Sequence, residues 1–317
     1  MEKIFFTFKI PDEGMLLLKG YEVTGNTQDR FLSKKEIIEG AKNCSALITL
    51  LSDKIDSEVI VSLPRLKVIA NYAVGFNNID IETARQRGVR VTNTPGVLTD
   101  ATADLAFGLI LATSRRIVES DRFVREHRFN GWKPDLFTGP SLADKNLGIV
   151  GLGRIGKAVA IRAKAFGMKV VYHNRKPMLP EEEEALGVRH MSLEDLLRIS
   201  DFLSLHVPLT AETRHMLNEK RISMMKREAI IINTARGALI DEEYLIKALR
   251  DGRIAAAGLD VYEEEPFISQ ELLDLPNVVL LPHVGSATHE ARRAMSIMVG
   301  RNVAAVLEGK EPPNVVV

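Results

Sequence analysis

Short apolar runs rich in β-branched residues alternate with helix-length amphipathic segments along the whole chain. This alternation is typical of βαβ units, in which helices cover both faces of a parallel sheet. We therefore expect an α/β fold built from doubly wound parallel sheets. At 317 residues the chain exceeds the length of a typical single core, which predicts two domains.

The strand pattern predicts two separate sheets. In the first hundred residues, strands are expected at Lys3 to Phe8, Ala46 to Leu50, Leu66 to Ala70 and Val89 to Asn93, with a helix at Ile81 to Gln86. A second βα series begins at Asn146, and its strands are expected to end near Gly151, Asn174, Val207, Asn233, Tyr262 and His283. Six strands suit a complete dinucleotide-binding sheet.

Two longer helices are expected beside these sheets. Thr99 and Asp100 can cap a helix that runs to Thr113 and is apolar on nearly every face, so it must be buried, between domains or between subunits. The segment from Thr288 to Glu308 is amphipathic and is followed by two prolines. It is expected to form a terminal helix that packs back on the first domain.

Composition excludes several classes of protein. Lys plus Arg equals Asp plus Glu at 42 each, so no global field attracts nucleic acid or an acidic membrane surface. The single cysteine, Cys44, cannot form an internal disulfide and is expected to be a small buried residue. The charged N-terminus does not resemble a signal peptide, and no apolar run is long enough to span a membrane, so a cytoplasmic protein is expected.

A glycine motif predicts a dinucleotide site. The segment from Asn146 to Ala160 holds Gly151, Gly153 and Gly156 in the spacing G-x-G-x-x-G, between a strand pattern and a helix pattern. In that context the first glycine permits a tight turn, the second lets the backbone approach a pyrophosphate, and the third lets helix and strand pack closely. The pyrophosphate is then expected at the helix N-terminus.

The end of the following strand bears on the choice of cofactor. An NAD enzyme usually carries an acidic residue there to bind the ribose hydroxyls, but this chain has Asn174, followed by Arg175 and Lys176. An acid would repel a 2′-phosphate, whereas these two cations can pair with one. NADP(H) is therefore expected as the preferred cofactor, with NAD(H) also possible; the alternative is that both cations are merely solvated.

Three ionisable residues follow the last predicted strands: Arg236, Glu265 and His283. Side chains at the carboxyl ends of parallel strands converge on one site, so these three are expected to meet beside the cofactor. His283 can donate a proton near neutral pH, Glu265 can orient its imidazole, and Arg236 can hold a substrate carboxylate and polarise its ketone. The set suits reduction of a 2-keto acid and needs no metal.

With these residues in place, the chain resembles the D-isomer-specific 2-hydroxyacid dehydrogenase family, most closely its glyoxylate/hydroxypyruvate reductase branch. The resemblance covers nearly the whole chain. It rests on the segments Gly151-Leu-Gly-Arg-Ile-Gly156, Asn233-Thr-Ala-Arg-Gly237, Gly258-Leu-Asp-Val-Tyr-Glu-Glu-Glu-Pro266 and Leu281-Pro-His-Val-Gly-Ser286, in family order and at family spacing.

The resemblance implies further site residues. Arg236, Glu265 and His283 would be the catalytic set, and Asp260 would lie by the nicotinamide carboxamide. Further expected cofactor contacts are Thr102, Arg154, Ile155, Val207, Pro208, Thr234, Ala235 and Gly285. Expected substrate contacts, in addition to Arg236 and His283, are Leu51 and Ser52, the backbone N–H groups of Val74 and Gly75, and Trp132, which would reach into the neighbouring subunit of a homodimer.

The sequence thus predicts a two-domain reductase. Residues 1–98 plus 286–317 would form a flavodoxin-like substrate-binding domain and residues 99–285 the dinucleotide-binding domain, with the reaction in a cleft between them. The expected reaction is NADPH-dependent reduction of glyoxylate to glycolate or of hydroxypyruvate to D-glycerate. Two alternatives stay open: an NAD-dependent relative that acts on D-lactate or 3-phosphoglycerate, and a nucleotide-sensing corepressor of the same fold.

Overall fold

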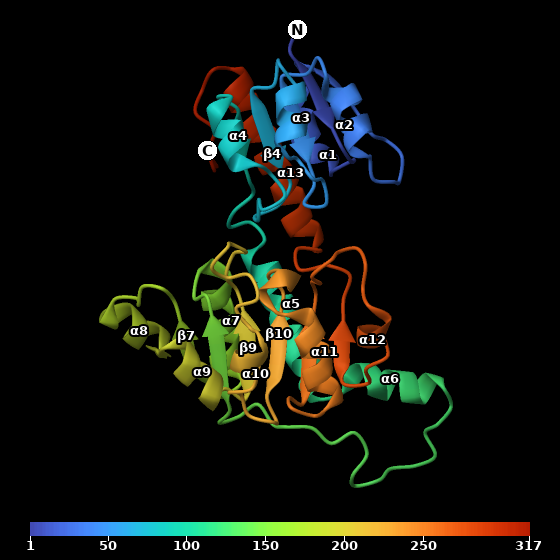
Figure 1. The fold of residues 1–317 in the computed structure, drawn as a ribbon, viewed down its shortest axis with the longest axis vertical. Coiled ribbons are helices and arrows are strands. Elements are labelled where there is room, and N and C mark those ends of the chain that lie inside the picture. The colour runs from blue at the N-terminus through green and yellow to red at the C-terminus, as the bar shows by residue number, and fades with distance from the viewer. The chain divides into compact units, whose positions relative to one another are not determined.

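The computed structural model describes all 317 residues and divides into two compact units. Unit 1 comprises Met1–Leu98 and Ser286–Val317, and unit 2 comprises Thr99–Gly285. Each unit contains one sheet with only parallel strand pairs, covered by helices (Figure 1). The expected fold class, two doubly wound α/β domains, is confirmed. The separate roles expected for the two units stay predictions.

The sheet of unit 1 has five strands in the order β2-β1-β3-β4-β5, which is the flavodoxin-like arrangement. Their bounds are β1 (Lys3–Phe6), β2 (Glu22–Gly25), β3 (Ala46–Thr49), β4 (Val68–Asn71) and β5 (Arg90–Thr92). Only four strands were expected here, and the missed one is β2. It lies at the sheet edge with no fully buried residue, so it has no apolar run to mark it.

Helices cover both faces of this sheet (Figure 1). The helices α2, α3 and α4 pack in a row, and α13 packs across β3, β4 and β5 beside α1. Their bounds are α1 (Asp12–Met15), η1 (Leu16–Leu18), α2 (Lys34–Ala41), α3 (Ser57–Ser62), α4 (Ile81–Gln86) and α13 (His289–Leu307). The last helix therefore packs on the first domain, as expected. Side chains of Ser33, Asp56, Asp80 and Thr288 cap four of these helices.

The sheet of unit 2 has seven strands in the order β12-β11-β10-β9-β6-β7-β8. Their bounds are β6 (Asn146–Val150), β7 (Lys169–His173), β8 (Val188–His190), β9 (Phe202–Leu205), β10 (Ile230–Asn233), β11 (Ala256–Leu259) and β12 (Val278–Leu280). The expectation of six strands was wrong by one, because β8 is a three-residue edge strand with a single buried residue. The last two strands also end earlier than the sequence indicated, at Leu259 and Leu280.

The helices of unit 2 are α5 (Thr99–Ser114), α6 (Ile117–Arg125), α7 (Arg154–Ala165), α8 (Pro180–Leu186), α9 (Leu193–Ile199), α10 (Glu219–Ile222), η2 (Gly237–Leu239), α11 (Glu242–Arg250) and α12 (Gln270–Leu273). The apolar helix α5 packs against α7 and against β10, β11 and β12. Only one face is buried there, because Asp104 and Gly108 stay exposed. Burial of the other face against a second subunit, one of the two possibilities expected from the sequence, stays a prediction.

Apolar side chains fill the space between sheets and helices in both units. The central strands β3, β4, β9 and β10 are buried along their whole length, which is why they read as continuous apolar runs. Cys44 is buried within the core of unit 1, as expected. None of the helices is both long and apolar enough to cross a membrane.

Candidate active site

The carboxyl ends of the strands in unit 2 gather most of the residues expected from the sequence. Strand order reverses between β6 and β9, and ligands of open α/β sheets bind outside the strand ends at such a point. Gly151 follows β6, and a Cβ atom on it would lie 2.8 Å from Cγ1 of Val207, which follows β9. The glycine motif and Val207 therefore lie side by side at the reversal.

The three glycines of the motif fit the roles that a dinucleotide requires. Gly151 has φ +99°, in the region that favours glycine. A Cβ on Gly156 would lie 2.3 Å from the Gly151 carbonyl oxygen, so helix α7 can pack this close only without a side chain. A Cβ on Gly153 would meet nothing within 4 Å, and no side chain caps α7, so its first N–H groups are open to a phosphate.

Asn174 lies directly after β7 and contacts the glycine turn. Its Oδ1 accepts a hydrogen bond of 2.7 Å from the N–H of Leu152. The amide Nδ2 is then the polar atom left for a ligand, and it is a donor rather than a carboxylate. Arg175 and Lys176 follow in an exposed turn. The position where an acid would bind ribose hydroxyls therefore carries no negative charge.

Arg236 lies in the turn after β10, and the side chain of the buried Asn233 holds the backbone of this turn. Asn233 Nδ2 donates to the Arg236 carbonyl at 2.8 Å, and its Oδ1 accepts from the Ala235 N–H at 3.0 Å. The hydroxyl of Thr234 is buried in this turn with no hydrogen-bond partner. A buried polar atom without a partner is costly in a folded chain, which marks Thr234 as a ligand-binding candidate.

His283 and Glu265 form a pair at the ends of β12 and β11. The Nδ1 of His283 lies 2.7 Å from Glu265 Oε2, and the Tyr262 N–H donates to Glu265 Oε1 at 3.1 Å. Burial raises the pKa of Glu265, but the hydrogen bond and charge of His283, together with the Tyr262 N–H and the charge of Arg236, outweigh it, so the net pKa is lowered. The carboxylate therefore stays ionised and holds Nδ1, which leaves Nε2 to face a substrate.

Arg236 lies close enough to this pair to interact with it. Burial lowers the pKa of its guanidinium, and the charge of Glu265 opposes that shift. An arginine remains cationic even so. The structure thus brings Arg236, Glu265 and His283 together within unit 2, from the ends of three adjacent strands.

The sequence indicated no positioning role for Asp260 or Tyr262. Both oxygens of the buried Asp260 accept backbone hydrogen bonds of 2.7 Å, from Val284 and Gly285. The Tyr262 hydroxyl donates to the Leu281 carbonyl at 2.8 Å. These bonds flank His283, whose φ of +56° is unusual for a residue with a side chain. Asp260 and Tyr262 therefore stabilise a strained backbone that carries the imidazole.

The remaining expected cofactor contacts also lie in unit 2. Arg154 and Ile155 form the first turn of α7, Pro208 follows β9, Ala235 follows β10, and Thr102 of α5 lies near Gly285. Trp132 is 82 % exposed and lies in the segment after α6.

The expected substrate loops belong to unit 1. Leu51 and Ser52 follow β3, and Val74 and Gly75 follow β4. The carbonyls of Val74 and Gly75 accept hydrogen bonds of 2.7 and 2.8 Å from the side chains of Asn93 and Asn71. Their N–H groups form no hydrogen bond within the chain. This backbone can therefore offer two donors to an anion.

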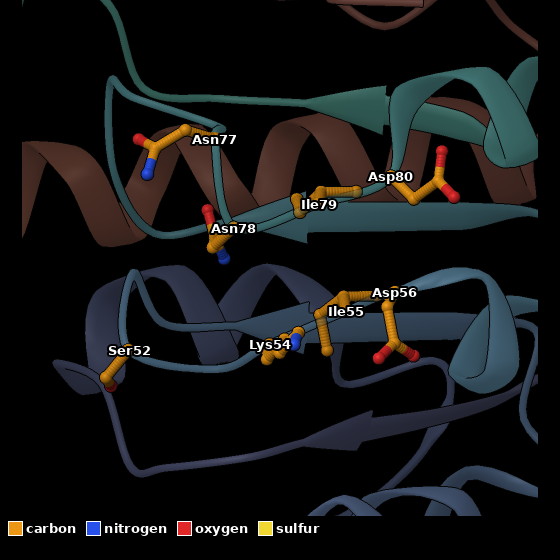
Figure 2. Close-up of a pocket in the computed structure, with 8 residues that line it drawn as sticks. All are labelled: Ser52, Lys54, Ile55, Asp56, Asn77, Asn78, Ile79 and Asp80. Atoms are coloured by element: carbon orange, nitrogen blue, oxygen red, sulfur yellow. The ribbon is translucent and has the colours of Figure 1, made fainter. Parts of the chain in front are cut away.

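A pocket of about 440 Å³ lies next to these loops, between the segments that follow β3 and β4 (Figure 2). Of the residues expected at the site, it includes only Ser52. We do not assign it to the reaction, because none of the three ionisable residues after β10, β11 and β12 lines it.

Comparison with known proteins places the chain in a family. The model of the D-isomer-specific 2-hydroxyacid dehydrogenase NAD-binding domain matches residues 107–285. A glyoxylate reductase from Thermococcus litoralis is 53% identical over 319 aligned positions, which cover 99% of this chain and 96% of the relative. The chain belongs to the D-isomer-specific 2-hydroxyacid dehydrogenases.

Solved structures agree with this membership. A protein from Thermus thermophilus has a TM-score of 0.92 at 47% identity, and the match covers 99% of this chain and 100% of that one. The NADPH-dependent glyoxylate/hydroxypyruvate reductase of Sinorhizobium meliloti, in complex with NADP and malonate, has a TM-score of 0.87 at 34% identity, covering 99% of this chain and 96% of its own. The protein is therefore an oxidoreductase that depends on a nicotinamide dinucleotide.

Proposed function

We propose that this dehydrogenase is an NADPH-preferring reductase that converts glyoxylate to glycolate and hydroxypyruvate to D-glycerate. The observation that carries the proposal is the 2.7 Å hydrogen bond between His283 and Glu265, with Arg236 beside it at the carboxyl edge of the sheet. A proton donor and a carboxylate anchor are what the reduction of a 2-keto acid requires from the protein. The names of the Thermococcus and Sinorhizobium relatives support the substrate class.

The proposed mechanism assigns binding, polarisation and proton transfer to separate groups of the chain. A hydride to the carbonyl carbon is the chemistry that the reduced nicotinamide supplies when bound. Arg236 and the free N–H groups of Val74 and Gly75 hold the substrate carboxylate, and Arg236 polarises the ketone. His283 donates the proton on Nε2 to the developing alkoxide, so the hydroxy acid leaves with one added hydride and one added proton. Glu265 keeps Nε2 directed toward the substrate and stabilises the imidazolium before transfer.

Initial rates with a panel of 2-keto acids test this function. We expect the wild-type protein to oxidise NADPH with glyoxylate and with hydroxypyruvate, and to do so with a higher kcat/KM than with pyruvate or 3-phosphohydroxypyruvate. A preference for the phosphorylated acid, or for pyruvate with NADH, would favour the NAD-dependent alternative. Absence of turnover with every acid and both cofactors would contradict the proposal.

The cofactor preference rests on the charge around Asn174. Replacing both Arg175 and Lys176 with alanine is expected to lower kcat/KM for NADPH by about 10- to 100-fold, because charge-assisted hydrogen bonds to the 2′-phosphate are lost. The value for NADH should change little. Lys169→Ala is the matched control, since Lys169 is an exposed cation at the opposite end of the same strand. An equal loss for both cofactors would show that the two cations do not bind the 2′-phosphate.

The proposed enzyme is a homodimer. Helix α6 has no buried residue, and Val124, Phe129 and Trp132 in and after it are 57%, 57% and 82% exposed. Large apolar side chains gathered on one segment mark a protein interface. Light scattering is expected to give twice the 35.2 kDa mass of one chain. Val124→Asp with Phe129→Asp should yield monomers, and a wild-type monomer would refute the dimer.

A further inference from the structure

A network of buried polar side chains lies at the carboxyl edge of the sheet in unit 1, and the mechanism above does not use it. Its members are Thr7 after β1, Thr49 of β3, Asp53 after β3, Asn71 of β4 and Asn78 after β4. All are buried except Asn78, which is half-buried. Burying a polar group costs free energy unless the group is hydrogen-bonded, so a buried polar network of this size requires an explanation.

Asn78 connects the segment after β4 to the segment after β3. Its Nδ2 donates to the Leu50 carbonyl at 3.1 Å and to the Asp53 carbonyl at 3.0 Å. Figure 2 shows this side chain directed across the gap between the two segments. The two carbonyls enclose Leu51 and Ser52, so one amide group fixes both ends of that short loop.

Asn71 connects the same network to the second loop. Its Nδ2 donates to the Gly75 carbonyl at 2.8 Å and lies 3.3 Å from Asn78 Oδ1. Its Oδ1 accepts from the Thr49 hydroxyl at 2.9 Å. This bond holds the Gly75 carbonyl in place, directly after the two N–H groups of Val74 and Gly75, which have no partner in the chain.

Asp53 anchors the first loop to β1. Its Oδ2 accepts from the Leu50 N–H at 2.7 Å and also from the Thr7 hydroxyl. Burial raises the pKa of Asp53, and both hydrogen bonds oppose that rise; the carboxylate forms no ion pair. In the strand order of unit 1, β1 and β3 lie at the point where ligands of flavodoxin-like sheets bind. The anchor is therefore next to the expected ligand position of this unit.

We propose that Asp53, Asn71 and Asn78 are positioning residues that couple the Leu51-Ser52 loop to the Val74-Gly75 loop and so determine affinity and selectivity for the 2-keto acid. This inference rests on the proposed function, because that function assigns both loops to substrate binding. The loops are separated by more than twenty positions in sequence. Because the network connects the two loops, a shift of the Leu51-Ser52 loop also displaces the N–H donors of the Val74-Gly75 loop.

The first test compares two asparagines whose Nδ2 atoms each donate to two backbone carbonyls. Asn78→Ala should raise KM for glyoxylate by about 10- to 100-fold and change the ratio of kcat/KM between glyoxylate and hydroxypyruvate, while Kd for NADPH stays unchanged. Asn277→Ala is the control, because the Nδ2 of Asn277 also donates to two backbone carbonyls, of Leu249 and Ala255, but lies in unit 2 at the start of β12. It should lower Tm without moving KM.

A second pair of variants distinguishes an effect on loop position from a general loss of protein stability. Both known bonds to Asp53 end on one oxygen, so the amide oxygen in Asp53→Asn can accept them, whereas Asp53→Ala removes the acceptor. We expect Asp53→Asn to keep the wild-type KM and Asp53→Ala to raise it as Asn78→Ala does. If all four variants change KM only in proportion to their loss of Tm, the network is structural and the inference is overturned.

Hydrogen exchange supplies a readout that does not depend on activity. Without substrate, Asn78→Ala should speed amide exchange in both segments, 49–55 and 71–79, and Asn277→Ala in neither. Faster exchange in one segment alone would refute the coupling. A wild-type protein that turns over no 2-keto acid would instead refute the proposed function, and the exchange data would still decide whether the loops are coupled.

Discussion

Replacing His283 with alanine is expected to lower kcat for glyoxylate reduction by about two to four orders of magnitude. Hydride transfer remains possible, but no side chain then donates a proton to the developing alkoxide. Glu265, whose Oε1 accepts from the Tyr262 N–H, would then face the space that the imidazole leaves, one side chain away from the substrate, so it is not placed to donate the proton instead. Steady-state rates with saturating NADPH and glyoxylate measure the loss.

The control for this prediction is His289→Ala, which removes an exposed histidine at the start of α13. That variant should keep the wild-type kcat. NADPH binding to His283→Ala, followed by fluorescence, should also stay near wild type, because the glycine turn is untouched. A His283→Ala protein that is folded, binds NADPH and retains more than about a tenth of wild-type kcat would contradict the assigned proton donor.

Replacing Arg236 with lysine is expected to lower kcat/KM for glyoxylate by about two to three orders of magnitude although the charge is retained. A guanidinium offers two parallel N–H donors to a carboxylate, and an ammonium does not. The turn that presents the side chain is held by Asn233 through backbone atoms, so the substitution leaves it in place. Most of the loss should appear in KM, since the carboxylate anchor acts before and during hydride transfer.

Arg227→Lys provides the matched control for this substitution. Arg227 is exposed and donates to the Gly252 carbonyl at 3.3 Å, at the opposite end of the strands. Its replacement should change neither kcat nor KM. If Arg236→Lys kept the wild-type KM for glyoxylate, the substrate carboxylate would have to be held elsewhere, and the two N–H groups of Val74 and Gly75 would be the remaining candidates.

Pattern reading failed at particular strands, each for an identifiable reason. The edge strands β2 and β8 were missed because edge strands bury little, so their residues show no apolar run. The end of β11 was placed too late for the opposite reason. Val261 and Tyr262 are buried after β11 has ended, and periodicity cannot distinguish a buried loop from a strand.

The positioning residues could not be predicted from the sequence either. Asn78 and Leu50 are 28 positions apart, and Asp260 lies 24 positions before Val284. An asparagine or aspartate in a loop is most often a turn residue, so its identity gives no signal of a distant partner. Only the folded backbone brings these donors and acceptors within hydrogen-bond distance.

The order of amino acids was sufficient to predict the α/β class, the glycine turn for a dinucleotide and the ionisable residues after the last strands. These features are local: glycine spacing, alternation of apolar runs and side-chain chemistry act within a few residues. The folded chain was needed to show that His283 pairs with Glu265, that Asp260 and Tyr262 hold the strained backbone around His283, and that buried amides connect two loops. Those contacts join distant segments, so they exist only once the sheets have formed.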